Sequence, residues 1–368
     1  MIGNAHNDRN FAIIAGPCSA ESPEQVLECA QSLPALGIST MRCGIWKPRT
    51  RPGSYEGPGD EGLQWLAQAK AATGIRSAVE VASAHHVQAA LEAGIDVLWI
   101  GARTTTSPFA MQEIADSLRD TDIPVWVKNP VNPDIDLWTG AIERLADAGL
   151  TSLGAIHRGF SSPAENVFRY SPLWEIPIEL RRRMPGLPIL CDPSHMAGCR
   201  DLIQPLSQMA LDLNADGLFV EVHPDPKNAL SDSAQQLTPK ELATLLDSLT
   251  KRHGGMESDL EALRPLRDRL DELDRQLVEI LSERMNVVRE IGLYKRAHNM
   301  AILQPERYRA IHDKAARQAR DMGIPESLVN SIFETIHAES VRYQLEKDKD
   351  QGTRSPVPGP FLSSDVDP

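Results

Sequence analysis

The sequence lacks any long apolar segment. No run of about 18 consecutive apolar residues, the length needed for a membrane-spanning helix, occurs anywhere in the chain. The residues after Met1 also lack the basic start and apolar centre of a signal peptide. These absences predict a soluble, cytoplasmic protein with no membrane partner.

Cysteine is scarce. The chain has only 5 cysteines in 368 residues, all in the first 200 and without the spacing of a disulfide framework. This usage is typical of reduced thiols in a cytosolic protein and argues against a disulfide-stabilised scaffold. The cysteines are Cys18, Cys29, Cys43, Cys191 and Cys199.

Basic residues are outnumbered by acidic ones. The chain has 38 Lys and Arg against 51 Asp and Glu, which leaves a formal net charge of −13. An acidic total argues against nucleic acid as a partner. Any site for an anionic ligand must therefore be a local basic pocket in an acidic protein.

The first 250 residues contain eight short apolar runs, each followed by a helical or loop stretch. Such alternation predicts βαβ units and a parallel sheet, and eight units match a (β/α)8 TIM barrel over residues 1–250. A doubly wound open sheet is the alternative, but no glycine-rich dinucleotide fingerprint follows the first run. The runs are 11–15, 38–41, 77–81, 97–100, 124–127, 151–156, 188–190 and 217–222.

Single cations stand at or just after the ends of several predicted strands. A barrel gathers the carboxyl ends of its strands on one face, so these cations would converge there. They repel one another unless anions fill the cleft, which predicts a small substrate carrying phosphate and carboxylate groups. The alternative for the segment 41–52 is an ordinary basic surface loop. The converging cations are Arg42, Lys47, Arg103, Lys128 and Arg158.

The same face is expected to collect possible metal ligands. Thiolate, imidazole and carboxylate groups together suit a first-row divalent ion, and the residue types leave Mn²⁺, Fe²⁺, Co²⁺ and Zn²⁺ open. Singly, the cysteine could be a small buried hydrophobe and the histidine an ordinary loop residue. The candidates are Cys18, His195, Glu221 and Asp232.

Five strand-end motifs resemble those of the 3-deoxy-D-arabino-heptulosonate 7-phosphate (DAHP) synthases, most of all the compact type I-beta group. The related 3-deoxy-octulosonate 8-phosphate synthases typically have an Asn-Arg-Ser-Ser run after the lysine, where this chain has Pro48-Arg49-Thr50. The motifs are Gly16-Pro17-Cys18-Ser19, Lys47-Pro48-Arg49-Thr50, Gly101-Ala102-Arg103, Asp192-Pro193-Ser194-His195, and Glu221-Val222-His223 with Leu230-Ser231-Asp232.

This resemblance implies condensation of phosphoenolpyruvate with erythrose 4-phosphate, the entry step of aromatic biosynthesis. It makes the four candidates above ligands of a divalent metal, with Mn²⁺ expected first, and places the five converging cations around phosphoenolpyruvate. Arg49 and Thr50 would bind the sugar phosphate. Lys47 would also act in proton transfer near the aldehyde.

Beyond residue 250 the strand signals stop. A polar linker, 251–257, contains Gly254-Gly255, and apolar positions spaced by three and four then predict a helix to about residue 295. Further helices are expected after Pro305, ending at Gly323, and from about Pro325 to residue 347. We predict a three-helix all-α domain over 258–348 and a disordered tail over 349–368.

Two cations interrupt the apolar stripe of the long helix. Arg284 and Lys295 are about three turns apart and face the same way, which indicates an anion in the helical core. Ser340 and Gln344 share one face of the last helix. The alternative is a coiled-coil dimerisation module whose cations lie at the edge of the seam.

This segment resembles the all-helical chorismate mutases. The resemblance implies an intertwined homodimer in which Arg267 reaches the site of the other chain. Arg267, Arg284 and Arg307 would bind the carboxylates of chorismate, Ser340 would also bind substrate, and Lys295 and Gln344 would act at the ether oxygen. The motifs are Leu266-Arg267-Asp268, Ser282-Glu283-Arg284, Lys295, Pro305-Glu306-Arg307 and Glu339-Ser340-Val341 with Gln344.

One departure from that family concerns two positions. The family usually has carboxylates where this chain has Gln304 and Tyr308. We nevertheless expect a bifunctional enzyme that also rearranges chorismate to prephenate, with prephenate as feedback effector through the helical domain. The alternative is a barrel enzyme with a non-catalytic ligand-binding or dimerisation module.

Overall fold

The computed structural model describes residues 11–49, 53–162, 167–250 and 257–345. The chain divides into two compact units, 1–253 and 254–368, which are described separately here. The expected tail 349–368, the linker up to residue 256 and the predicted ligand Thr50 lie outside the described residues.

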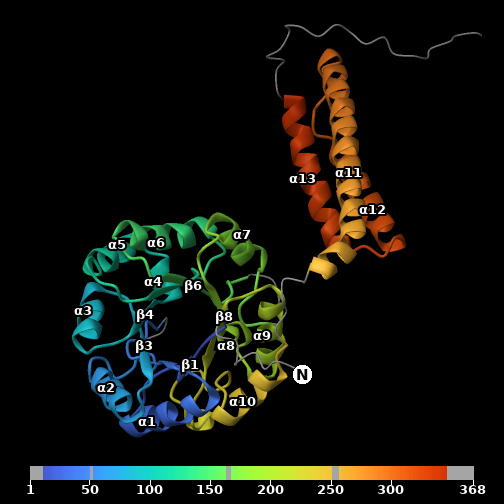
Figure 1. The fold of residues 1–368 in the computed structure, drawn as a ribbon. Helices are drawn as coiled ribbons and strands as arrows, with labels where there is room; N and C mark the ends of the chain where they lie inside the picture. Colours follow the sequence, from blue (N-terminus) through green and yellow to red (C-terminus); the bar gives the residue numbers. More distant parts are fainter. Residues whose placement is uncertain (1–10, 50–52, 163–166, 251–256, 346–368) are drawn as a thin grey trace, which may run out of the picture. The chain divides into compact units, whose positions relative to one another are not determined.

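The first unit is a closed barrel of eight parallel strands, in which each strand pairs with the next and β8 pairs with β1 (Figure 1). The predicted TIM barrel is thereby confirmed, and the open-sheet alternative is wrong. The strands are β1 (Ala12–Gly16), β2 (Thr40–Arg42), β3 (Arg76–Val81), β4 (Val97–Ile100), β5 (Val125–Lys128), β6 (Leu153–His157), β7 (Ile189–Cys191) and β8 (Gly217–Glu221).

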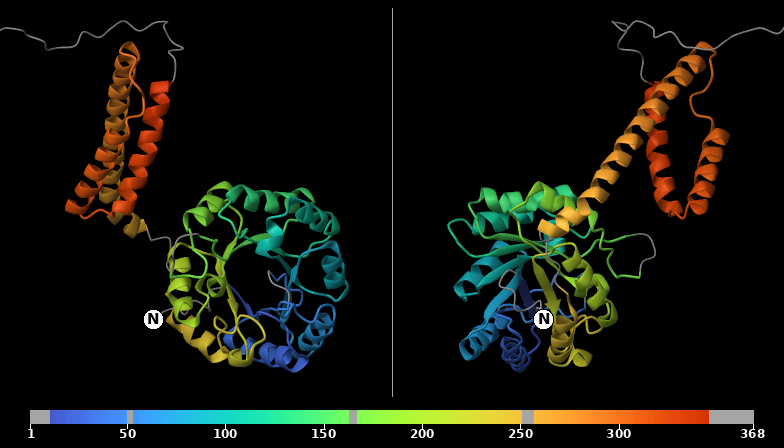
Figure 2. Two further views of the ribbon diagram at one scale, coloured as in Figure 1. Left: turned by 180° about the vertical axis from the view of Figure 1, so that it is seen from behind. Right: turned by 45° about the vertical axis from the view of Figure 1, so that its right-hand side comes forward.

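Helices surround the strands on the outside of the barrel (Figure 2). Many begin at a Ser, Thr or Asp cap. At α10, for instance, the Thr238 hydroxyl accepts from the Glu241 amide while the Glu241 carboxylate accepts from Thr238. The helices are α1 (Pro23–Ser32), α2 (Glu61–Thr73), α3 (Ala84–Glu92), α4 (Ala102–Thr105), α5 (Pro108–Ser117), α6 (Ile135–Asp147), α7 (Glu175–Arg183), α8 (Pro193–Ala197), α9 (Ile203–Asp212) and α10 (Pro239–Ser248).

The barrel has two apolar layers. The larger lies between strands and helices, and the smaller fills the interior with side chains that include Ile14, Trp99, Leu190 and Phe219. Because alternate strand residues point inward and outward, the interior is a packed core and not a channel. The carboxyl ends of all eight strands therefore open onto one face above this core.

The second unit consists of α11 (Glu257–Ala297), α12 (Pro305–Asp321) and α13 (Glu326–Leu345). Both α11 and α12 pack along α13 (Figure 1). The structure thus has the predicted three helices. Since α11 begins at Glu257, Pro265 lies in its third turn. None of the described helices is long and apolar enough to cross a membrane.

Candidate functional site

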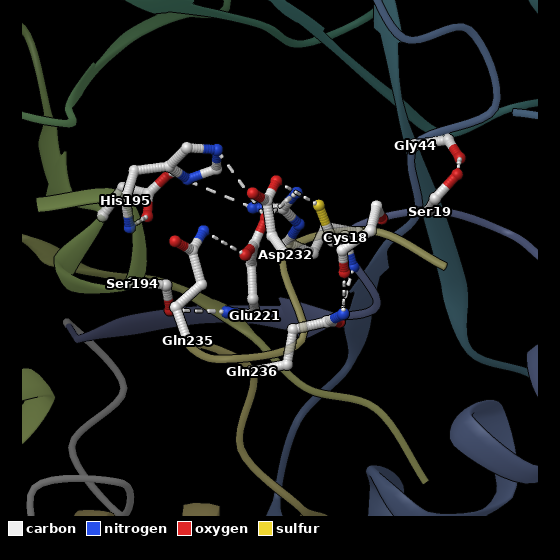
Figure 3. A network of polar contacts seen from close by, with 12 residues as sticks. Cys18, Ser19, Gly44, Ser194, His195, Glu221, Asp232, Gln235 and Gln236 are labelled. Carbon is white, nitrogen blue, oxygen red and sulfur yellow. Dashed lines mark hydrogen bonds and ion pairs between the residues drawn. The ribbon is translucent and has the colours of Figure 1, made fainter. Parts of the chain in front are cut away.

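Three of the four predicted metal ligands converge at the carboxyl ends of β1 and β8. The ligand atoms of Cys18, Glu221 and Asp232 all lie within 4.8 Å of one another, and Cys18 Sγ is 3.1 Å from Asp232 Oδ2. The fourth, His195, reaches them from α8, with Nε2 3.7 Å from Glu221 Oε1 (Figure 3). Four side chains from three distant stretches of sequence thus form one cluster.

Neighbouring groups hold these side chains in position. Gln236 Oε1 accepts from the Cys18 amide at 2.9 Å, and Gln235 Nε2 donates to Glu221 Oε2 at 2.6 Å (Figure 3). Gly44 lies against Cys18 so closely that a Cβ there would be 2.4 Å from the Cys18 carbonyl oxygen. The glycine after β2 is therefore required for the close approach of the two loops.

The cluster has the donor set that a divalent ion requires. His195 Nδ1 lies 2.7 Å from Asp192 Oδ2, the arrangement by which a buried carboxylate orients a metal-binding imidazole. Although burial opposes it, His195 and Arg42 lower the pKa of Glu221, and His195 and Lys47 lower the pKa of Asp232, so both carboxyl groups are ionised at neutral pH. Sulfur, nitrogen and carboxylate oxygen together fit a first-row transition ion better than Mg²⁺ or Ca²⁺.

Lys47 is the nearest cation to this cluster. Its ammonium nitrogen lies 2.7 Å from Cys18 Sγ and 2.8 Å from the Cys18 carbonyl oxygen. Burial, with Glu221 and Asp232, raises the pKa of the Cys18 thiol to about 12 against the opposing effect of Lys47. The free thiol is thus protonated, and a bound divalent ion would be needed to ionise it.

A cleft opens beside the cluster, and cations dominate its lining. Four of the five predicted cations line it: Lys47, Arg103, Lys128 and Arg158. Arg49 lines it as well, with its Nε bonded to the Tyr55 carbonyl oxygen at 2.8 Å. The described part of the chain thus brings cations from the ends of four strands to one cleft.

Arg42, the fifth predicted cation, is not among the residues that line this cleft. Its buried guanidinium lies over the Phe219 ring at 4.6 Å, donates to Glu221 Oε1 at 3.1 Å and lies 3.9 Å from Asp192 Oδ2. Lys128 Nζ lies 2.8 Å from the same Asp192 oxygen. Glu221 and Asp192 therefore offset the charges of two of the five predicted cations without a bound ligand.

The lining residues that were not predicted include Arg169 and Tyr170. Arg169 Nη1 lies 3.1 Å from Asp232 Oδ1, and the Arg158 guanidinium stacks on the Tyr170 ring at 3.5 Å. Both belong to the loop after β6 but follow His157 by more than ten residues. Inspection of strand ends alone misses them, because the sequence does not show that residues this far beyond a strand lie beside the cleft.

In the helical unit, four predicted residues meet between α11 and α13. Arg284 Nη1 donates to Ser340 Oγ at 2.7 Å, and Gln344 Nε2 donates to the Ser340 carbonyl oxygen at 3.2 Å. Lys295 is buried and its ammonium donates to the Ile302 carbonyl oxygen at 2.6 Å. Gln344 Oε1 is buried without a hydrogen-bond partner among the described residues.

The remaining two predicted arginines are exposed. Arg267 precedes Arg284 by 17 residues on α11, which is about 25 Å along a helix. Within one chain it is therefore remote from Arg284, as expected if it serves another chain. Arg307 lies in the first turn of α12.

Comparison with known proteins assigns both units. Residues 2–256 match the DAHP synthetase I family. The chain belongs to the DAHP synthetase I family. Residues 266–345 match chorismate mutase type II. The chain is therefore an enzyme with a DAHP synthase domain and a chorismate mutase domain. The predicted resemblances and both predicted activities are confirmed. Both reactions belong to aromatic biosynthesis.

Individual relatives agree with this assignment. The phospho-2-dehydro-3-deoxyheptonate aldolase of Thermotoga maritima is 35% identical over 253 residues, which cover 68% of this chain and 71% of the relative. A crystal structure of the Thermotoga maritima DAHP synthase superposes with a TM-score of 0.59 at 32% identity, covering 71% of this chain and 70% of that one. The 2-dehydro-3-deoxyphosphooctonate aldolase of Delftia acidovorans is 29% identical over 68% of this chain and 95% of its own length.

Proposed function

We propose that the barrel condenses phosphoenolpyruvate with erythrose 4-phosphate at the cluster of Cys18, His195, Glu221 and Asp232 and the adjoining cationic cleft. The observation that carries this proposal is the position of Lys47, 2.7 Å from Cys18 Sγ, which joins the ligand cluster to the cleft. Mn²⁺ is the first candidate for the ion, with Fe²⁺, Co²⁺ and Zn²⁺ as alternatives. When bound, such an ion would polarise the aldehyde oxygen.

The side chains of the barrel have separate tasks in this proposal. Lys128, Arg103 and Arg158 hold the carboxylate and phosphate of phosphoenolpyruvate, and preplaced cations stabilise the charge that develops there. Arg42 holds the Glu221 carboxylate in position, with Nη2 3.1 Å from Oε1. Arg49, with Thr50, binds the sugar phosphate, and Lys47 transfers a proton near the aldehyde.

Kinetics of Lys47→Ala and Arg103→Ala test this assignment. Each should lower kcat/KM for DAHP formation about 10- to 100-fold, because a charge-assisted hydrogen bond is lost. Arg76→Ala is the matched control, since Arg76 is an exposed cation at the opposite end of β3. Mutase activity of the same chains verifies that their helical unit is folded. Wild-type turnover in either cleft variant would remove that residue from the site.

For the helical domain, we propose that Arg284, Lys295, Ser340 and Gln344 bind chorismate, with Arg307 and the Arg267 of a second chain. The rearrangement needs no nucleophile, so catalysis consists of positioning and stabilisation of charge on the breaking C–O bond. Support comes from the buried Lys295 and from Gln344 Oε1, which is buried without a partner among the described residues, since both are polar groups in a helical core.

A homodimer follows from the same proposal. The N-terminal half of α11 carries an exposed apolar stripe with the alternating spacing of three and four typical of coiled coils. A second copy of the stripe would cover it and bring Arg267 to the other chain. The exposed fractions are Leu263 43%, Leu266 66%, Leu270 57%, Leu273 51%, Leu277 56% and Ile280 61%.

We further propose that the mutase site is the feedback sensor of the barrel, with prephenate as effector. A dicarboxylate at Arg284 and Lys295 removes the repulsion between these cations and changes the free energy of the helical domain. Inhibition requires that prephenate bind one arrangement of the two domains more tightly than another.

A further inference from the structure

Two histidines and a tyrosine pack together where α12 and α13 meet. The Tyr308 ring centroid lies 4.4 Å from that of His312 and 4.4 Å from that of His337. Tyr308 is one of the two positions where related mutases usually have a carboxylate. Two imidazole rings therefore contact one phenol ring at this end of the helical domain.

His337 lies on the same face of α13 as two proposed substrate-binding residues. It precedes Ser340 by three residues and Gln344 by seven, the spacing that places side chains in one row along a helix. Ser340 already accepts from Arg284 across the contact with α11. His312 belongs instead to the row on α12 that continues into the buried Ala315 and Ala319.

The Nε2 atom of His337 is buried, and within the described residues it has no hydrogen-bond partner. A buried polar atom of this kind is rare unless a ligand or water completes it. The charged and titratable groups around it are Arg284 and Lys295 from α11 and His312 from α12. Burial and these cationic neighbours lower the pKa of His337, so the imidazole is neutral at neutral pH.

We propose that His337 is a further substrate-binding residue of the mutase site, whose Nε2–H donates a hydrogen bond to an oxygen of the bound dicarboxylate. Tyr308 is a positioning residue whose ring packs against the imidazole at an interplanar angle of 59°. A neutral donor beside Arg284 and Lys295 complements an anionic ligand without adding a third charge. The inference rests on the proposed mutase site around Arg284.

The test uses the full-length chain and the rate of prephenate formation from chorismate. His337→Leu should lower kcat/KM at least tenfold, while His337→Gln should stay within threefold of wild type, because its amide N–H replaces the Nε2–H. His298→Leu is the matched control, since His298 is exposed and also stacks on a tyrosine, Tyr294, at 4.0 Å. DAHP synthase activity of each variant verifies that its barrel is folded.

The inference is overturned if His337→Leu keeps activity within twofold of wild type, or if the Leu and Gln variants are equally impaired. Should His337→Leu fail to fold, His337→Phe keeps a ring against Tyr308 without the N–H and carries the same expectation. Arg284→Ala separates the two proposals. If Arg284→Ala retains mutase activity, the proposed site itself is wrong. If Arg284→Ala loses mutase activity while His337→Leu keeps it, only the proposed role of His337 is wrong.

Discussion

At the scale of single residues, burial determines the chemical role of Cys18. The thiol is fully buried beside two ionised carboxylates, and burial, assisted by Glu221 and Asp232, raises its pKa to about 12. A buried structural cysteine has no need of such neighbours. A metal ligand does, because the ion compensates the assembled negative charge.

We therefore expect Cys18→Ser to retain the barrel fold but to lose both bound metal and DAHP synthase activity. A hydroxyl is a poor replacement for a thiolate ligand, so metal affinity should fall at least about 100-fold. Metal content by mass spectrometry and activity after EDTA treatment are the measurements. Cys199→Ser, at a partly exposed cysteine outside the cluster, is the control. Full activity in EDTA with no metal bound would refute the claim.

Asp96 illustrates a charged residue that supports the fold at the other end of the barrel. Its carboxylate accepts from Lys70 Nζ at 2.7 Å and from the Ser77 amide at 2.9 Å, joining α2, β3 and the start of β4. Although burial opposes it, these hydrogen bonds lower the pKa of Asp96 below its ordinary value of 3.8.

Asp96→Asn should lower the free energy of unfolding of the barrel by about 1–2 kcal/mol at neutral pH. Because the folded-state pKa is the lower one, this stabilisation is present above pH 3.8 and is lost as the pH falls through the folded-state pKa. Denaturant unfolding at pH 7 and pH 3 measures the change. Asp116→Asn, at an exposed carboxylate paired with Arg119, should have a smaller effect. DAHP formation should be unaffected, since this end is remote from the site.

At the scale of elements, α11 combines two different surfaces. Its C-terminal half packs on α13, where Arg284 Nη1 donates to Ser340 Oγ, whereas its N-terminal half exposes the leucine stripe. Isolated exposed leucines are ordinary, but a continuous row at heptad spacing indicates a partner helix.

The double variant Leu270→Lys with Leu277→Lys should convert a dimer into monomers and abolish mutase activity while DAHP synthase activity persists. Lysines in the seam repel across a two-fold axis and remove apolar contact. Sedimentation velocity reports the oligomeric state. Val278→Lys is the matched control, because Val278 is 65% exposed and adjacent but lies off the stripe. A wild-type monomer, or a monomeric variant with full mutase activity, would contradict the model of Arg267 acting in a second chain.

At the scale of the whole molecule, we propose that the helical domain controls the activity of the barrel. Prephenate should inhibit DAHP formation, and Arg284→Ala should remove both mutase activity and this inhibition. Coupling between two sites typically amounts to about 1–3 kcal/mol, or 5- to 150-fold in affinity. Barrel activity with added prephenate and small-angle scattering with and without it are the measurements. The mechanism is ruled out if prephenate does not inhibit DAHP formation by the wild-type chain, or if it still inhibits the Arg284→Ala chain.

The sequence alone determined the periodic features of this protein. Eight apolar runs separated by helical stretches predict the barrel because a parallel sheet needs crossover helices, and a spacing of three and four predicts α11 because a helix has 3.6 residues per turn. The motif around Cys18 consists of consecutive residues, and Ser340 and Gln344 are four residues apart on one helix. Because both features are local in sequence, their chemistry could be recognised without coordinates.

Only the tertiary structure decided which charges face one another. Arg42 ends β2 and Lys128 ends β5, yet Glu221 and Asp192 neutralise them from positions far along the chain. Arg169 and Tyr170 reach the cleft through a long loop, and the His337 imidazole meets Tyr308 through the packing of α12 on α13. Electrostatic energies depend on distance and burial, which sequence separation does not determine, so these pairings became visible only in the folded chain.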